Sequence, residues 1–80
     1  MTSIDTAEAL FAGYLQPSDH PTSAQVRAAV RDSLRRLGGQ GGCAAVRATA
    51  YGDHPDTAAE RMRWALAITK HDGLSTLIAA

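Results

Sequence analysis

Proline and glycine divide this chain of 80 residues into four segments, and that division constrains its fold more than any other feature. Pro17, the run Gly38–Gly42 and the pair Gly52 and Pro55 fall between the segments. Glycine is costly inside a helix and proline cannot continue one, so both mark helix ends. Within the segments, apolar residues recur three and four positions apart, the period of a helix with one buried face. The sequence therefore predicts an all-α domain of four short helices.

The residues at the segment ends set the expected helix boundaries. The first helix is expected to begin near Ser3 or Asp5, where Asp5 and Glu8 have the spacing of a capping box, and to end before Pro17. The others are expected at 22–37, 43–51 and 55–71. The stripe of the first helix comprises Ile4, Ala7, Leu10, Phe11, Tyr14 and Leu15, and that of the second Val26, Ala29, Val30, Ser33, Leu34 and Leu37. Residues 74–80 form a short apolar tail that adds a helical turn or lies across the bundle.

A sequence echo at a spacing of 34 residues indicates that the four helices form two similar helical hairpins. Asp19-His20-Pro21 recurs as Asp53-His54-Pro55, each time between one predicted helix and the next. There an aspartate can accept hydrogen bonds from free backbone N–H groups, and proline is tolerated in the first turn. We interpret the echo as a helix-start device. The histidines and aspartates are an alternative metal-ligand set, but zinc sites usually use ligands closer in sequence, and no metal or other cofactor is predicted.

Size and charge limit the classes of function. Residues 1–80 form one domain, and its many alanines, 16 in all, predict a core with few large side chains. Eight basic and eight acidic residues cancel, so no net field attracts nucleic acid or a membrane. The single cysteine, Cys43, excludes an internal disulfide. With no signal-peptide pattern and no stretch that could span a membrane, a cytoplasmic protein is predicted.

Two short motifs resemble known families. Asp32-Ser33-Leu34 resembles the phosphopantetheine attachment site of acyl carrier proteins, which are four-helix domains of similar length. In that family the serine opens an acidic helix after a loop. Here the tripeptide lies late in the predicted helix 22–37, with Ser33 on the apolar stripe and arginines around it. We therefore expect a buried serine that bonds back to a helix carbonyl and carries no arm.

The second resemblance is to bacterial helix-turn-helix proteins, through helices 43–51 and 55–71. The run that carries it is Ala48, Gly52, Pro55, Thr57, Arg61 and Arg63. The resemblance implies DNA binding, with phosphate contacts from Arg27, Arg31, Arg35, Arg61 and Arg63. Asp53 and Arg61 depart from the motif because they occupy positions that it fills with apolar side chains. Three carboxylates, Asp53, Asp56 and Glu60, would also repel phosphates, so DNA binding is the alternative function.

Residues with catalytic potential do not form a pattern. No sequence spacing links a histidine to Cys43 or to Ser33 as a base to a nucleophile. Cys43 follows the glycine run at a predicted helix start, where the helix dipole can activate a thiol, but a small buried residue is the simpler interpretation. We therefore predict that the protein is not an enzyme.

The predicted fourth helix carries apolar residues on two faces. Ala58, Met62 and Ala65 lie on one, and Trp64 and Ile68 lie more than a third of a turn away. A helix of this kind needs cover on both faces, and tryptophan is enriched in binding hot spots. The cover is expected from the tail or from another chain. The sequence thus predicts a non-catalytic interaction or regulatory module, a homodimer or the partner of another protein, with an interface of Trp64, Ile68, Leu74, Leu77 and Ile78.

Overall fold

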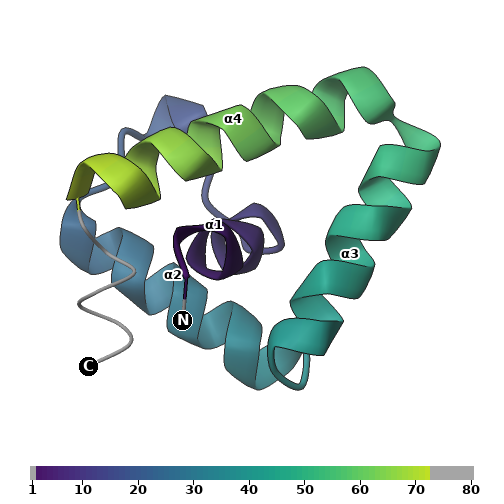
Figure 1. Ribbon diagram of the computed structural model, residues 1–80. Helices are drawn as coiled ribbons and strands as arrows, with labels where there is room; N and C mark the ends of the chain where they lie inside the picture. Colours follow the sequence, from purple (N-terminus) through teal and green to yellow (C-terminus); the bar gives the residue numbers. More distant parts are fainter. Residues whose placement is uncertain (1, 73–80) are drawn as a thin grey trace.

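In a computed structural model the chain forms four α-helices and one short 3₁₀ helix (Figure 1). The structure describes residues 2–72, with the side chains of residues 2–70. The elements are α1 (Ser3–Phe11), η1 (Pro17–Asp19), α2 (Ser23–Arg36), α3 (Gln40–Asp53) and α4 (Pro55–Asp72). No strand occurs between residues 2 and 72, and the predicted all-α, four-helix class is confirmed. The predicted apolar tail lies outside the described residues.

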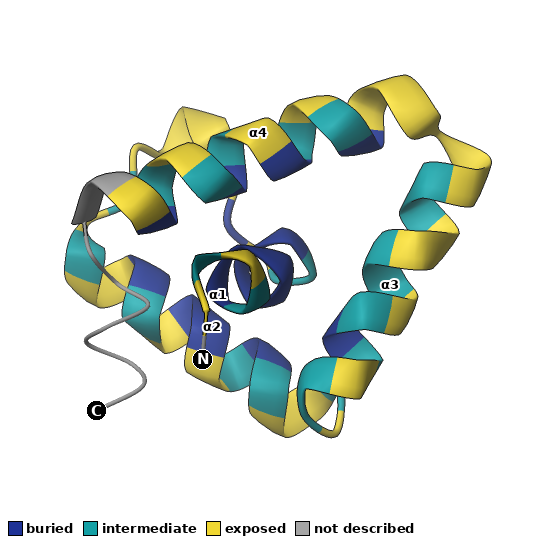
Figure 2. Ribbon diagram, viewed as in Figure 1, coloured by how far each residue is buried: buried dark blue, intermediate teal, exposed yellow. Residues whose placement is uncertain are grey.

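α1 lies at the centre of the fold, and α2, α3 and α4 surround it (Figure 1). All six residues from Thr6 to Phe11 are buried, including Glu8 (Figure 2). Four residues of the predicted stripe are buried, namely Ala7, Leu10, Phe11 and Leu15. The burial is not one-sided, however, and Ile4 and Tyr14 are 60% and 58% exposed. Three neighbours can enclose a helix that is short and rich in small side chains. Helices consecutive in the sequence also touch, α1 with α2 and α3 with α4, as hairpins require.

The core is small, and alanine makes up much of it. Its buried apolar residues are Ala7, Ala9, Leu10, Phe11, Leu15, Val26, Ala29, Val30, Cys43, Ala58, Met62 and Ala65. Five of these twelve are alanines, which allow helices to approach closely but each remove little apolar area from water. Larger side chains around this cluster are only half-buried. The fold therefore depends strongly on the polar contacts that join its helices.

Threonines cap α1 and α2, where aspartates were predicted at these helix starts. Thr2 Oγ1 accepts a hydrogen bond from the Asp5 N–H at 3.0 Å, and the Asp5 carboxylate accepts one from the Thr2 N–H at 3.3 Å. Thr22 and Gln25 form the same reciprocal pair, at 3.2 and 2.8 Å. The predicted capping box of Asp5 with Glu8 is wrong because α1 begins at Ser3 and the side chain of Glu8 is buried.

The two copies of the Asp-His-Pro echo have different backbones. Asp19 ends η1 and accepts a hydrogen bond from the Gln16 N–H at 2.8 Å, while His20 adopts the left-handed region with φ 47°. Asp53 is the last residue of α3, and Pro55 begins α4. The helix-start interpretation is therefore wrong for Asp19, which holds the turn before α2, and for Asp53, which lies inside α3. Pro55 does occupy the first helical position, where its missing N–H costs nothing.

The glycine run is only partly a break between helices. Gly38 and Gly39 have φ of 78° and 100°, and the Gly39 N–H donates to the Leu34 carbonyl at 2.7 Å. This is a Schellman ending for α2, which requires a left-handed residue and so favours glycine. α3 then begins at Gln40, three residues earlier than the predicted start at Cys43. The sequence prediction was wrong here because it treated all four glycines as breakers.

Gly42 is inside α3 for a packing reason. A Cβ atom built on Gly42 would lie 1.7 Å from the carbonyl oxygen of Leu37, so the start of α3 packs directly on the end of α2. A Cβ atom built on Gly41 meets no atom within 4 Å. Gly42 is therefore needed for the close approach of two helices, whereas Gly41 is not.

Candidate functional site

The two predicted interface residues in the described part of the chain, Trp64 and Ile68, are half-buried and pack against the core cluster. They lie at the edge of the buried face of α4, which is formed by Ala58, Met62 and Ala65. The guanidinium carbon of Arg61 lies 5.2 Å from the centroid of the Trp64 ring. The other predicted interface residues, Leu74, Leu77 and Ile78, lie outside the described residues.

Arg61 fastens α4 to the C-terminal end of α1. Its guanidinium donates to the carbonyl oxygens of Phe11 at 2.8 Å, Gly13 at 3.1 Å and Leu15 at 2.8 Å, and to the side-chain oxygen of Gln16 at 3.5 Å. It also lies 5.8 Å from the centroid of the Phe11 ring. The last carbonyls of a helix have no partner inside the helix, so Arg61 satisfies groups that a cap would otherwise satisfy. Burial lowers the pKa of Arg61, although a guanidinium stays protonated in proteins.

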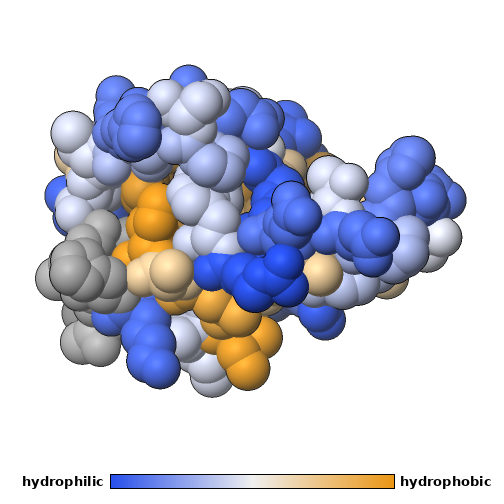
Figure 3. All heavy atoms as spheres, turned by 90° about the horizontal axis from the view of Figure 1, so that it is seen from above, coloured by the Kyte–Doolittle hydropathy of each residue, from blue (hydrophilic) through white to orange (hydrophobic). Residues whose placement is uncertain are grey.

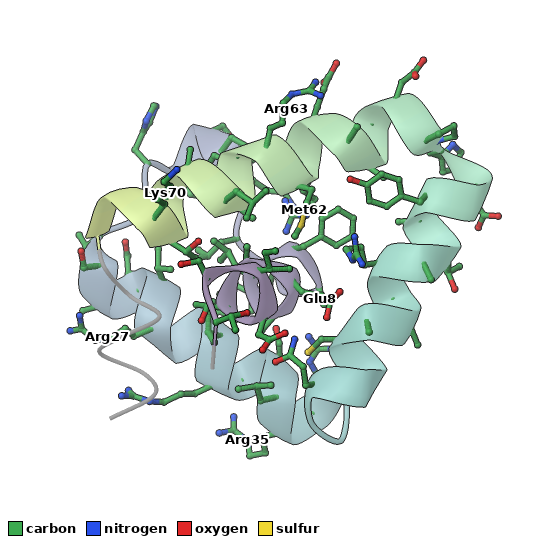
Figure 4. All side chains as sticks on the ribbon, viewed as in Figure 1. Glu8, Arg27, Arg35, Met62, Arg63 and Lys70 are labelled. Atoms are coloured by element: carbon green, nitrogen blue, oxygen red, sulfur yellow. The ribbon has the colours of Figure 1, made fainter. Side chains whose placement is uncertain are left out.

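The five arginines of the nucleic-acid alternative do not form one surface. Arg61 is engaged inside the fold, as just described. Arg27, Arg31 and Arg35 lie along α2, whereas Arg63 is exposed on α4. Figure 4 shows Arg63 extending away from the edge where Arg27 and Arg35 lie. One residue separates α3 from α4, while a helix-turn-helix has a turn of three or four. The geometry thus differs from that of the DNA-binding motif.

A partly buried polar cluster that the sequence did not reveal joins α1 to α3. The Glu8 carboxylate accepts hydrogen bonds from Arg47 Nε at 2.6 Å and from Gln40 Nε2 at 3.0 Å. Gln40 Nε2 also donates to the Asp5 carbonyl at 2.9 Å, and the Arg47 guanidinium lies 5.8 Å from the Tyr51 ring centroid. A buried carboxylate is tolerated only when it is paired in this way. The cluster therefore fixes α3 in one position along α1.

Cys43 is fully buried, as predicted from its position among small residues. Burial, and secondarily the negative charge of Glu8, raise the pKa of the Cys43 thiol above its ordinary value, and the charge of Arg36 opposes the shift. A thiol with a raised pKa and no exposed surface is a poor nucleophile. Cys43 is therefore a packing residue of α3.

We expect Cys43 to react with a thiol reagent at pH 8 about 100-fold more slowly in the folded than in the unfolded protein, since reaction requires opening of the fold. The folded pKa is the higher one, so the unfolded chain loses its thiol proton first as pH rises. The free energy of unfolding that the protonated thiol contributes is thus lost as the pH rises past 9.0, the ordinary pKa of a cysteine thiol. Denaturation between pH 7 and 10 should show a steeper alkaline loss for the natural protein than for Cys43→Ala. Rapid labelling of the folded protein would contradict this account.

Ser33 is buried, as the sequence predicted, but its hydroxyl does not form the expected bond to a helix carbonyl. Its Oγ has no hydrogen-bond partner among the described residues. A Cβ atom built on Gly13 would lie 2.9 Å from this oxygen, so α2 packs closely against the chain that follows α1. The Ser33 hydroxyl is therefore enclosed, unlike the serine of an acyl carrier protein.

We expect a phosphopantetheinyl transferase to leave the intact mass of the protein unchanged. We also expect Ser33→Ala to keep or raise the free energy of unfolding, by up to about 2 kcal/mol, since it removes a buried hydroxyl without a partner. Thermal and urea denaturation measure the second effect. Mass added by the transferase, or a marked loss of stability in Ser33→Ala, would contradict the enclosed, unpartnered hydroxyl.

The histidines of the sequence echo, His20 and His54, are both exposed. Within the described residues, no three side chains among histidine, cysteine, aspartate and glutamate gather closely enough to hold a metal ion. The echo therefore does not assemble a ligand set in this part of the chain.

An open apolar hollow, called here the α3 groove, lies along α3. Ala45, Val46, Thr49 and Ala50 line it, and its volume is about 410 Å³. Of the fourteen residues of α3, only Cys43 is fully buried. The α3 groove and the half-buried edge of α4 are thus two of the apolar surfaces in the described part of the chain, beside the exposed side chains of Ile4 and Tyr14.

No helix within the described residues is both long and apolar enough to cross a membrane. Comparisons with family models, with curated proteins and with solved structures find no match to this chain.

Proposed function

We propose that this protein is a small, non-catalytic interaction module of the cytoplasm, which binds a second protein chain through apolar surface left at the edge of its core. One observation carries the proposal: six large hydrophobic side chains around the core are only partly covered by the fold. They are Leu34, Leu37, Tyr51, Trp64, Leu66 and Ile68. Figure 3 shows hydrophobic side chains reaching the surface on the face seen from above α4.

The energetics favour burial of these side chains by another chain. Removing apolar surface from water contributes about 25 cal/mol per Å². Because the core has few large side chains, part of the apolar surface of the monomer stays in contact with water. Trp64 is also held in place by Arg61, so little side-chain entropy is lost when a partner covers the ring. Trp64 therefore has the properties of a binding hot spot.

The test is to follow Trp64 emission and molecular mass together as the protein concentration rises from about 5 to 500 µM. If a second copy covers this edge, emission shifts to shorter wavelength, iodide quenching weakens and the melting temperature rises with concentration. Ile68→Lys should abolish these changes, whereas Ala67→Lys, at an exposed neighbouring position, should not. Removal of residues 74–80 then distinguishes the two sources of cover. If the tail covers Trp64 of its own chain, the truncation exposes Trp64 and leaves the oligomeric state unchanged. If another copy covers it, the exposure of Trp64 depends on the oligomeric state. Full quenching of Trp64 at every concentration would refute self-association at this edge.

A further inference from the structure

The chain has zero net charge, but the regions around the two ends of α3 carry opposite charges. At its N-terminal end lies the last turn of α2, where Arg35 and Arg36 have side chains that are 76% and 50% exposed. These two arginines share a single carboxylate, that of Asp32, at 3.1 and 3.4 Å. Arg31, one turn earlier, is exposed as well. This end therefore has an excess of positive charge.

The C-terminal end of α3 has an excess of negative charge. Asp53, Asp56 and Glu60 are all exposed there, and none has an ion-pair partner among residues 2–70. The C-terminal end of a helix is itself the negative end of its dipole, so Asp53 adds like charge to like. Figure 1 shows α3 as one edge of the molecule, running from the end of α2 to the start of α4. The two charged ends are thus held apart on one edge.

Between these ends the outer face of α3 is small and uncharged. Its exposed residues before Asp53 are Gly41, Ala45, Ala48, Thr49 and Gly52, and the α3 groove continues from Ala45 and Thr49. The one charged side chain in the middle of α3, Arg47, is turned inward to Glu8. Small side chains allow two helices to approach to about 8 Å, the short end of the usual range.

We propose that a second copy of this chain occupies this face, with the two α3 helices antiparallel about a twofold axis near the middle of α3. A half-turn about that axis brings the negative end of each α3 to the positive end of the other, with Asp53 of one copy facing Arg35 of its neighbour. The same patch is used on both copies, as a closed twofold dimer requires. The antiparallel helix dipoles add to the attraction. This deepens the proposed function by naming one partner, and it uses a surface separate from Trp64.

The size of the face sets the expected affinity. Fourteen residues of helix span about 21 Å, so the contact falls at the small end of specific interfaces. We expect weak association, so the experiments need protein between about 10 µM and 1 mM. Because charges contribute, raising the salt concentration from 50 to 500 mM weakens the association by about tenfold.

The first test places a large charged side chain on the face. Ala45→Arg should raise the dissociation constant at least about tenfold, as measured by sedimentation equilibrium. Ala28→Arg is the matched control, because Ala28 is an exposed alanine in the middle of α2 and arginine is nearly as good a helix former as alanine. Equal affinity of both variants would overturn the proposal.

The second test exchanges the charges. Arg35→Glu and Asp53→Arg should each weaken the homodimer, because each places like charges opposite one another. Mixed in equal amounts, the two variants should form a heterodimer about as tight as the natural dimer, since both contacts are again between opposite charges. Failure of the mixture to restore association would overturn the charge-paired geometry. A merely destabilised fold would not be rescued by mixing, and circular dichroism of each variant checks the fold independently.

The outcomes separate this inference from the proposed function. If Ile68→Lys abolishes association and the α3 variants leave it intact, the protein is an interaction module but its dimer does not use α3. If the α3 variants abolish association while Trp64 emission stays independent of concentration, α3 is the dimer surface. A protein that remains monomeric at 1 mM and low salt refutes the α3 dimer. Binding of random duplex DNA that is lost in Arg35→Glu would assign the basic end to nucleic acid instead.

Discussion

Replacing Arg61 by alanine is expected to lower the free energy of unfolding by about 3 kcal/mol or more. The change removes three partly buried hydrogen bonds from a charged donor to carbonyl oxygens, each worth about 1.5–3 kcal/mol, and two contacts with aromatic rings. In a domain of this size that loss corresponds to a fall in melting temperature of roughly 15 °C. Urea denaturation followed by circular dichroism measures it directly.

Arg63→Ala is the matched control for this prediction. Arg63 lies two residues along the same helix and is exposed, so its loss should change the free energy of unfolding by no more than about 0.5 kcal/mol. Arg61→Lys should be intermediate, because lysine keeps the charge but lacks the planar fork that reaches several carbonyls at once. Similar stability of Arg61→Ala and Arg63→Ala would mean that Arg61 does not hold α1 and α4 together.

Gly42→Ala is expected to cost about 2–3 kcal/mol, although alanine normally stabilises a helix. The added methyl group would lie 1.7 Å from the Leu37 carbonyl oxygen, so α3 must move away from the end of α2. Such a movement would also strain the hydrogen bonds of Gln40 and Arg47 with Glu8. Thermal denaturation of the purified variant measures the loss.

Gly41→Ala should have the opposite effect and raise the free energy of unfolding by about 0.5–1 kcal/mol. The two glycines are adjacent in the same helix turn, but a methyl group on Gly41 meets no other atom within 4 Å. Helix propensity alone therefore determines the change in the free energy of unfolding at Gly41, whereas packing against Leu37 determines it at Gly42. Stabilisation by both substitutions would show that α2 and α3 are not in close contact.

The sequence predicted the number and type of the elements because both depend on local signals. Helical periodicity and the positions of proline and glycine are enough to identify four helices and to place α4 at Pro55. The start of α3 was missed because glycine is costly in a helix on average, and only the packing against Leu37 shows why Gly42 lies in one. The caps Thr22 and Gln25 did have a sequence signal, the Thr-x-x-Gln pattern of a capping box.

The contacts that join the helices were not predictable, because their partners are far apart in the chain. Arg61 bonds to carbonyls 46 to 50 residues away, and main-chain oxygens carry no sequence signature. Glu8 lies one turn after Ile4, on the face predicted to be buried, but the sequence pattern assigned it to a capping box. Its partners, Gln40 and Arg47, are 32 and 39 residues away, and nothing in one sequence selects them.

Native-state hydrogen exchange tests the central claim most directly, namely that α1 is the enclosed hub of the fold while α3 is an open edge. The amides of Ala7 to Phe11 should exchange only through global unfolding and should be equally protected at 20 µM and 1 mM. The amides of α3 should be less protected at 20 µM and should gain protection at 1 mM, as the second copy covers them. If α1 exchanges as fast as α3, and α3 is unaffected by concentration, the account is contradicted.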